Sequence, residues 1–321
     1  MTPATASSIH GNWATLLLPI NRDDSIDYGL LAAELDHFIA ARVNGIYSNG
    51  SAGEFYTQTE DEFDRVSALL AEHCERAGMP FQIGACHMSP QLSRERIRRA
   101  KALRPSAFQV ILPDWFSPTF EEIVAFLETL AAEAAPVPLV VYNPPHAKRH
   151  LAPAEWAELV AHNRAIVGMK VPGGDEAWYR AMQPTMREVS VFIPGHTLAS
   201  GLARGARGAY SNVACLSPKG GQAWYELCLR DPVAGIEFEQ AVQTFWATHV
   251  VPLISQDKLA NMAADKANAV AGNWLPGIHP RLRWPYRSAT LERCSAIGAA
   301  ARIALPGLFA CPREPSIARF T

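Results

Sequence analysis

Lysine is scarce in this chain, and neither sign of charge predominates. Among its 321 residues, 29 are lysine or arginine, of which only six are lysine, and the formal net charge is −2. A nearly neutral protein offers no electrostatic footprint for a nucleic acid, so we expect no nucleic-acid partner. Because lysines are few, a lysine inside an apolar stretch is more informative here than in a lysine-rich chain.

Long apolar runs and paired cysteines are also lacking. No stretch reaches the roughly 18 apolar residues that span a bilayer, and the N-terminal residues lack the basic and apolar regions of a signal peptide. The six cysteines lie far apart without a CxxC pair, which is typical of reduced thiols in a cytoplasmic protein. We therefore expect a cytoplasmic protein with no membrane contact.

Metal ligands with recognisable spacing are lacking as well. His146 and His150 are four residues apart, but they follow Pro144 and Pro145 and are not expected to share a helix face. We expect no metal site and no cofactor.

What the chain does contain is a repeated alternation of strand and helix patterns. Apolar runs, most of them continuous, are typical of parallel strands covered on both faces, and helical patterns lie between them, one with a capping box formed by Thr119 and Glu122. The expected strands are Ala14–Leu18, Gly45–Ser48, Phe81–Ala85, Phe108–Leu112, Leu139–Tyr142, Ile166–Lys170, Val191–Ile193 and Gly208–Asn212.

Eight strand–helix units at intervals of roughly 25–35 residues predict an α/β fold, a (β/α)8 TIM barrel with additional C-terminal helices. We expect an N-terminal tail over residues 1–12, the barrel core over 13–215 and a C-terminal helical region over 216–321, packed on the barrel as one structural domain. A doubly wound open sheet is the alternative, but the glycine-rich phosphate loop typical of that fold is missing near the first strand.

Three segments place reactive groups at the C-terminal ends of predicted strands, where such barrels have their active sites. Ser51 lies in a glycine-rich loop that presents backbone N–H groups to an anion, and Tyr142 precedes two prolines. Lys170 ends an apolar strand, where desolvation favours the neutral, nucleophilic amine that condenses with a ketone. Taken singly, each has a structural alternative: an ordinary turn, a buried tyrosine, and a lysine in an ion pair.

Together these segments resemble the dihydrodipicolinate synthase / N-acetylneuraminate lyase family of class I Schiff-base aldolases. The resemblance covers most of the chain, from about Trp13 to Pro285, and its motifs occur in the family's order. They are the G-[ST]-x-G-E loop at 50–54, the tyrosine segment at 139–145, the lysine strand at 166–170, the G-x-x-G segment at 205–213 and the Leu-Arg-Trp-Pro motif at 282–285.

The resemblance implies a role for each matching residue. Lys170 is expected to form a Schiff base with a 2-oxo acid such as pyruvate, and Tyr142 to act as general acid and base. Ser51, with the backbone N–H groups of Ser51 and Ala52, is expected to hold the carboxylate. Tyr210 is expected to lend a backbone carbonyl near the lysine and to shape the pocket. His196 is a candidate specificity residue, with a structural histidine as the alternative.

Departures from the family's patterns concern the distal half of the substrate. Trp115 stands in place of the second relay tyrosine of the synthases, and Ala147 in place of an arginine, although Lys148 and Arg149 are adjacent. The acidic pair of the neuraminate pattern is replaced by His196 and Thr197.

We therefore predict a cofactor-independent carbon–carbon or carbon–oxygen lyase that acts on pyruvate or a related 2-oxo acid. The reaction is reversible aldol cleavage or addition, or dehydration of a 2-oxo-3-deoxy acid. The alternatives are a true 4-hydroxy-tetrahydrodipicolinate synthase and a non-catalytic 2-oxo-acid-binding paralogue; a metal-dependent barrel lyase lacks a ligand cluster. The partner substrate, an aldehyde or sugar acid, is left open, and the resemblance implies a homotetramer arranged as a dimer of dimers.

Overall fold

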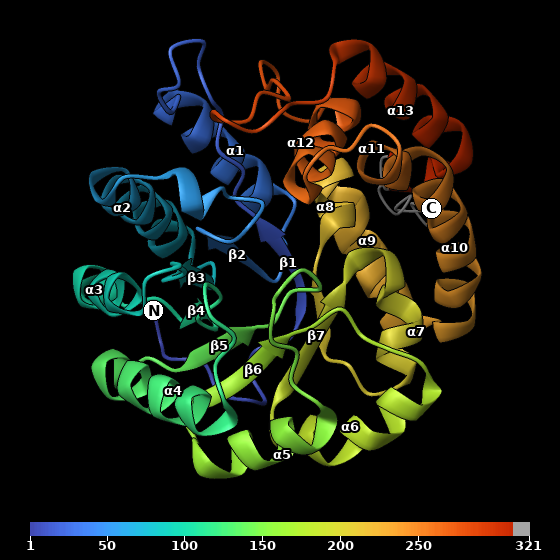
Figure 1. Ribbon diagram of the computed structural model, residues 1–321. Helices are drawn as coiled ribbons and strands as arrows, with labels where there is room; N and C mark the ends of the chain where they lie inside the picture. The colour runs from blue at the N-terminus through green and yellow to red at the C-terminus, as the bar shows by residue number, and fades with distance from the viewer. Residues whose placement is uncertain (311–321) are drawn as a thin grey trace, which may run out of the picture.

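The computed structural model describes residues 1–310 and contains a closed barrel of eight parallel strands (Figure 1). Each strand pairs with the next, and the last pairs with the first. The strands are β1 Gly11–Thr15, β2 Gly45–Ser48, β3 Phe81–Gly84, β4 Ala107–Ile111, β5 Leu139–Tyr142, β6 Ile166–Lys170, β7 Ser190–Pro194 and β8 Gly208–Tyr210. This architecture confirms the predicted (β/α)8 barrel. Cys311 lies outside the described residues.

Helices follow the strands and form the outer ring of the barrel. They are α1 Tyr28–Ala40, α2 Glu60–Ala77, α3 Pro90–Ala100, α4 Phe120–Ala134, α5 Pro153–His162, α6 Glu176–Glu188, α7 Leu198–Ala203 and α8 Asn212–Leu216. Short helical turns precede some of them, including η1 Phe55–Thr57 and η3 Gly195–Thr197. The predicted capping box opens α4, because Thr119 N–H donates to Glu122 and the Glu122 N–H donates to the Thr119 hydroxyl, at 2.7 and 3.3 Å.

A further set of helices follows the eighth strand and lies along one side of the barrel, beside α7 and α8 (Figure 1). They are α9 Pro218–Arg230, α10 Pro232–Phe245, the π-helical turn η4 Trp246–Val250, α11 Val251–Ser255, α12 Asn261–Gly272 and α13 Leu291–Ala304. Helix α12 packs against α8 and α13, and this packing carries α12 to the mouth of the barrel.

The first strand begins three residues earlier than the apolar run predicts, at Gly11 instead of Ala14. Gly11 pairs with Gly208 of β8, and a Cβ on Gly208 would lie 2.1 Å from the Gly11 carbonyl oxygen. This close backbone approach closes the barrel. The run Leu16–Leu18 is buried beyond the strand's end, where the Leu17 N–H donates to Glu34 at 2.9 Å. The run thus marked burial instead of strand pairing.

Side chains inside the barrel differ from those between strands and helices. Trp13, Tyr47, Phe192 and Tyr210 form part of a buried cluster that fills the interior, whereas Ile46, next to Tyr47, packs in the larger core. Successive residues of a strand point to opposite faces. The alternation therefore brings aromatic rings from several strands into the barrel, directly beneath its mouth.

Candidate active site

A cavity of about 190 Å³ lies at the C-terminal ends of the strands. Six of the seven side chains named from the sequence line it, namely Ser51, Ala52, Tyr142, Lys170, His196 and Tyr210. Trp115 is not among the lining residues. Tyr47 and Asp265 also line the cavity, from β2 and from α12, and neither was expected from the sequence.

Lys170 is enclosed by aromatic rings. It is the last residue of β6 and pairs in register with Tyr142 of β5 and Phe192 of β7. Its Nζ atom lies 4.1 Å from the ring centroid of Tyr142, and 5.0 and 5.2 Å from those of Tyr47 and Tyr210. Nζ also donates a hydrogen bond to the Tyr47 hydroxyl at 3.3 Å. The rings hold the amine at the centre of the mouth.

The enclosed amine of Lys170 is a weaker base than an ordinary lysine. Burial lowers its pKa from 10.5 to about 8, and the Asp265 carboxylate opposes this shift by favouring the charged form. Burial in turn raises the pKa of Asp265 from 3.8 to about 6, while the Lys170 charge acts in the opposite direction. Near neutral pH a usable fraction of Lys170 is therefore the neutral nucleophile, with an ionised carboxylate facing the same cavity.

Asp265 lines the cavity from α12, and within the described residues its carboxylate is not part of an ion pair such as that of Lys266 and Glu54. Its neighbour Lys266 points the other way, and is fully buried in an ion pair with Glu54. The two adjacent charged residues of α12 therefore differ in their surroundings. Lys266 is buried in an ion pair that connects parts of the fold, and Asp265 lines the cavity.

The loop after β2 offers unpaired backbone donors to an anion. The N–H groups of Ser51 and Ala52 make no hydrogen bond within the described residues. The loop turns sharply, because Asn49 and Glu54 both have positive φ angles, of 53° and 50°. Gly53 lets it approach its neighbours, since a Cβ there would lie 3.0 Å from the Leu16 carbonyl oxygen. Unpaired N–H groups at a cavity wall are able to donate hydrogen bonds to an anion.

Glu54 anchors this loop to two distant segments. Its carboxylate accepts from Lys266 Nζ and, at 2.9 Å, from the backbone N–H of Arg283. Lys266 Nζ also donates to the Arg281 carbonyl at 2.7 Å. All the charge of this buried pair is therefore matched, and the loop, α12 and the Leu-Arg-Trp-Pro segment are joined at one point.

Tyr142 and Tyr210 flank the lysine with different environments. Burial raises the pKa of Tyr142, and the Ser51 hydroxyl opposes the shift. The phenol is therefore kept protonated beside the loop that follows β2. The Tyr210 hydroxyl donates to Gln82 at 2.6 Å inside the barrel. Tyr142 is thus placed to move a proton, and the Tyr210 ring forms a wall.

His196 is neutral and held in one orientation. Its backbone N–H donates to the Asn212 Oδ1 atom at 3.1 Å, which leaves the Asn212 amide nitrogen to donate to His196 Nδ1 at 2.8 Å. Nδ1 is therefore an acceptor, and the ring proton is on Nε2. Burial lowers the pKa of His196. Its ring is nearly parallel to that of Trp246, with the ring centroids 5.9 Å apart.

Trp115 and the two cations near it lie apart from this cavity. Trp115 is 73% exposed, and Lys148 Nζ donates to its carbonyl oxygen at 2.8 Å and lies 5.3 Å from its ring. Arg149 is paired with Glu155. Neither cation therefore replaces the family's arginine at the cavity.

A second cavity, of about 600 Å³, adjoins the first and shares Ser51 and Asn261 with it. Its walls come from η1, the loops after β3, β4 and β5, and the segment from α11 to α12. Most of its lining side chains are apolar or aromatic. The mouth of the barrel thus has a small polar chamber and a larger apolar one.

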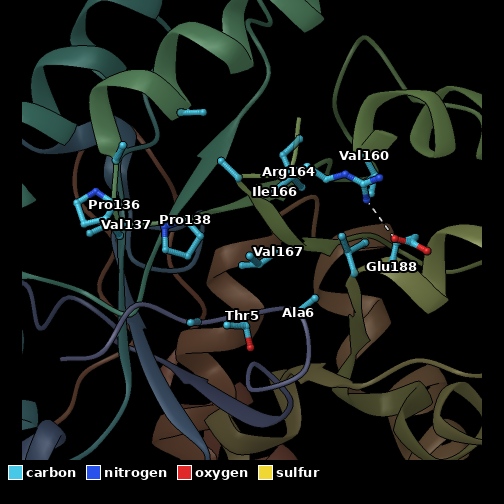
Figure 2. A pocket seen from close by; sticks show the side chains of 15 residues that line it. Thr5, Ala6, Pro136, Val137, Pro138, Val160, Arg164, Ile166, Val167 and Glu188 are labelled. Atoms are coloured by element: carbon cyan, nitrogen blue, oxygen red, sulfur yellow. Dashed lines mark hydrogen bonds and ion pairs between the residues drawn. The ribbon is translucent and has the colours of Figure 1, made fainter. Parts of the chain in front are cut away.

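A third hollow lies at the opposite end of the barrel (Figure 2). Pro136, Val137 and Pro138 line it just before β5, with Arg164 just before β6. Arg164 and Glu188 form an ion pair across one side of it at 3.1 Å. It contains none of the candidate residues, and active sites of such barrels lie at the other end.

Two features are absent from residues 1–310. No three histidine, cysteine, aspartate or glutamate side chains lie together in a way that could hold a metal ion. No helix in this part of the chain is long and apolar enough to cross a membrane.

The fold and the site together define a lyase of the class I, Schiff-base type, with an amine nucleophile at the mouth of a (β/α)8 barrel. The chain belongs to the dihydrodipicolinate synthetase family, whose sequence model matches residues 8–234.

Relatives in this family have different activities. The chain is 27% identical to an N-acetylneuraminate lyase of Rhizobium meliloti over 206 residues, covering 63% of this chain and 67% of the relative. It is 28% identical to a 4-hydroxy-tetrahydrodipicolinate synthase of Pseudoalteromonas atlantica over 219 residues, covering 65% and 71%. The two are almost equally similar to this chain, so similarity alone does not choose between their reactions.

Solved structures match the fold over nearly the whole chain. YagE, a prophage protein of E. coli K12 crystallised with pyruvate, has a TM-score of 0.81 at 19% identity, covering 92% of this chain and 98% of that one. A Clostridium difficile protein crystallised with mannosamine has a TM-score of 0.79 at 18% identity, covering 91% and 99%.

Proposed function

We propose that Lys170 is the Schiff-base lysine of a lyase that makes or breaks a carbon–carbon bond next to a pyruvate unit. The observation that carries the proposal is the Lys170 amine, whose pKa of about 8 is set by burial among three tyrosine rings. The Ser51 and Ala52 N–H groups lie on the same cavity and suit a 2-oxo acid's carboxylate.

The proposed reaction starts when neutral Lys170 attacks the ketone carbon; one proton is taken up from solvent and a water molecule leaves, giving a protonated imine. The imine withdraws electrons from the adjacent carbon, which loses a proton and becomes an enamine nucleophile. That carbon attacks an aldehyde carbon, and the aldehyde oxygen takes up a proton. Water then hydrolyses the imine and regenerates the amine, while cleavage follows the same steps in reverse.

Tyr142 is proposed as the group that moves the proton at the new hydroxyl. It lines the cavity with Lys170 and is kept protonated by burial. Asp265 is proposed as the counter-charge of the imine, because it is the only carboxylate among the residues that line the cavity. A negative charge there stabilises the positive intermediate more than the neutral amine.

Borohydride trapping tests the proposal directly. The protein is incubated with pyruvate, reduced and weighed intact, beside Lys170→Ala and, as a control, Lys219→Ala on the exposed surface of α9. Wild type and the control should carry one 1-carboxyethyl group from the reduced imine of pyruvate, and Lys170→Ala none. An adduct that persists in Lys170→Ala would remove Lys170 from the mechanism.

The same assay separates the alternatives. A trapped adduct without turnover of any aldehyde would support a 2-oxo-acid-binding paralogue. A true 4-hydroxy-tetrahydrodipicolinate synthase is less well supported, since Trp115 replaces a tyrosine of the synthase pattern and no cationic side chain lines either cavity except Lys170.

We also propose a cytoplasmic homotetramer. The family resemblance supports the assembly, and so do large exposed side chains such as Trp115 and Trp284. The five described cysteines are all unpaired, which fits a reducing compartment. Light scattering of the purified protein would give the mass of the assembly, and a monomer would contradict the proposal.

A further inference from the structure

The apolar cavity lies beside the Lys170 cavity, where the proposed reaction needs room for the rest of the substrate. It shares Ser51 and Asn261 with the smaller cavity, which holds about 190 Å³ around the amine. A space of that size suits the three-carbon unit on the lysine. The portion of the substrate beyond the new carbon–carbon bond needs a second space, and the adjoining cavity of about 600 Å³ supplies one.

The walls of this second cavity are apolar and partly aromatic. Leu112, Leu259 and Met262 line it and are buried. Phe55, Tyr56 and Tyr286 also line it, and their rings meet edge to face, with centroids 5.3 Å apart for Phe55 and Tyr56 and 5.2 Å for Tyr56 and Tyr286. Such a wall is complementary to a flat aromatic ring.

Charged groups that would bind an anionic substrate are missing from this cavity. No lysine or arginine is among its lining residues. Burial lowers the pKa of His146, so that its imidazole is neutral near pH 7. The one carboxylate, Asp114, accepts the Lys148 backbone N–H at 2.7 Å. A carboxylate on the distal part of a substrate would lose its hydration here without gaining a cation.

A sugar chain fits this cavity poorly as well. Each of its hydroxyl groups would need a hydrogen-bond partner, and apart from the tyrosine hydroxyls the polar side chains on the walls are Ser51, Asp114, His146 and Asn261. Buried hydroxyls without partners weaken binding, whereas an uncharged ring gains by leaving water.

We infer that the aldehyde substrate of this enzyme has an uncharged aromatic body, which occupies the second cavity. The inference rests on the proposed Schiff-base function. In the addition direction the enamine carbon of the Lys170-bound pyruvate unit forms a bond to the aldehyde carbon, and the aldehyde oxygen becomes a hydroxyl by taking one proton. Hydrolysis releases a 4-aryl-4-hydroxy-2-oxobutanoate, and cleavage of that acid gives pyruvate and the aromatic aldehyde.

The test compares three aldehydes at saturating pyruvate: benzaldehyde, glyceraldehyde as a hydroxylated probe, and succinic semialdehyde as an anionic probe. We expect kcat/KM to be about tenfold or more higher for benzaldehyde than for either of the others. A preference for glyceraldehyde or succinic semialdehyde would overturn the inference.

Two variants of Ile254 make the comparison independent of the aldehydes' own reactivity. Ile254 lines the second cavity from α11 and is 37% exposed. A variant with a polar side chain at this position should therefore still fold. Ile254→Asp should lower kcat/KM for benzaldehyde about tenfold more than it lowers that for glyceraldehyde. Ile254→Lys should raise kcat/KM for succinic semialdehyde relative to benzaldehyde. The matched control is Ile303→Asp on α13, where the side chain is 83% exposed and lines neither cavity.

The outcomes separate this inference from the function on which it rests. Absence of a borohydride-trapped pyruvate adduct in the wild type would overturn the Schiff-base function itself. A normal adduct, with aldehyde preferences that the Ile254 variants leave unchanged, would overturn only the aromatic substrate. A change of oligomer mass in Ile254→Asp without a change in aldehyde preference would assign this wall to subunit packing, and would also overturn the inference.

Discussion

Burial among the rings of Tyr47, Tyr142 and Tyr210 lowers the pKa of Lys170, and the Asp265 carboxylate is the largest of the groups that oppose this shift. The rate of pyruvate adduct formation should rise with pH as the amine loses its proton, with a midpoint near 8 in the wild type. Asp265 is ionised in this range, because its pKa is about 6. Asp265→Asn removes a charge that favours the ammonium form, and the midpoint should therefore move to lower pH. The measurement is the initial rate of trapping against pH.

Asp61→Asn is the control for this shift, because Asp61 is exposed on α2 and does not line the cavity. Its midpoint should equal that of the wild type. An Asp265→Asn midpoint at or above the wild-type value would show that the carboxylate does not act on Lys170.

Tyr142 should be needed for turnover but not for adduct formation. Tyr142→Phe keeps the ring that lies 4.1 Å from Lys170 Nζ and removes only the hydroxyl. We expect normal trapping with pyruvate and a fall in kcat of about 10²–10⁴-fold, the usual contribution of a positioned acid–base group. Tyr225→Phe on α9, which lines neither cavity, is the matched control. Full activity in Tyr142→Phe would assign the proton transfer to another group.

Sequence reasoning reached some of these residues and not others for a physical reason. Lys170 and Tyr142 end strands, and the barrel rule alone places both at the mouth. Tyr47 lies within a strand, and its interior position follows from the period-two alternation of side chains in β2 and not from the end of the strand. Asp265 is far along the chain on an added helix, whose packing no local pattern predicts. The signal available was an adjacent Asp-Lys pair in an otherwise apolar, alanine-rich segment.

At the scale of elements, the buried ion pair of Glu54 and Lys266 connects the loop after β2 to α12. Both side chains are fully buried, so removing one partner leaves an uncompensated charge. Glu54→Ala should lower the free energy of unfolding by about 3–5 kcal/mol. It should also weaken pyruvate trapping, because the loop loses its anchor. Chemical denaturation and the trapping assay measure the two effects.

An exposed ion pair provides the control for this prediction. Glu188 pairs with Arg164 at 3.1 Å, with 58% and 73% of the side chains exposed, and Glu188→Ala should cost only about 0–1 kcal/mol. The double variant Glu54→Leu/Lys266→Met removes both charges and should be more stable than Glu54→Ala. Equal losses in the single and double variants would mean that the buried charge is not the cause.

The elements themselves were largely predictable, and their exact ends were not. Continuous apolar runs and capping residues place strands and helices, because burial and hydrogen bonding act locally. The start of β1 depends instead on Gly11 meeting Gly208, a contact between residues nearly 200 positions apart. The course of α9 to α13 along the barrel likewise depends on contacts with α7 and α8 that the sequence does not display.

At the scale of the whole molecule, the active site reduces the stability of the fold. Burial lowers the pKa of Lys170 from 10.5 to about 8, so the folded state binds a proton at this residue more weakly than the unfolded state does. The penalty is fully present below pH 8 and disappears as the pH rises toward 10.5. Lys170→Met places an apolar side chain among the three tyrosine rings. It should therefore be more stable than the wild type at pH 7, by about 1–3 kcal/mol.

The pH dependence of this gain distinguishes it from better packing. The difference in the free energy of unfolding between Lys170→Met and wild type should be largest near pH 7 and should shrink by pH 10, because wild-type Lys170 is then neutral in the folded state. Lys219→Met, at an exposed position on α9, should change stability by less than about 0.5 kcal/mol at either pH. A gain that is equal at pH 7 and pH 10 would assign the stabilisation to packing and leave the lowered pKa of Lys170 without support. A loss of stability at pH 7 would mean that the ammonium group, with Asp265 beside it, stabilises the folded state.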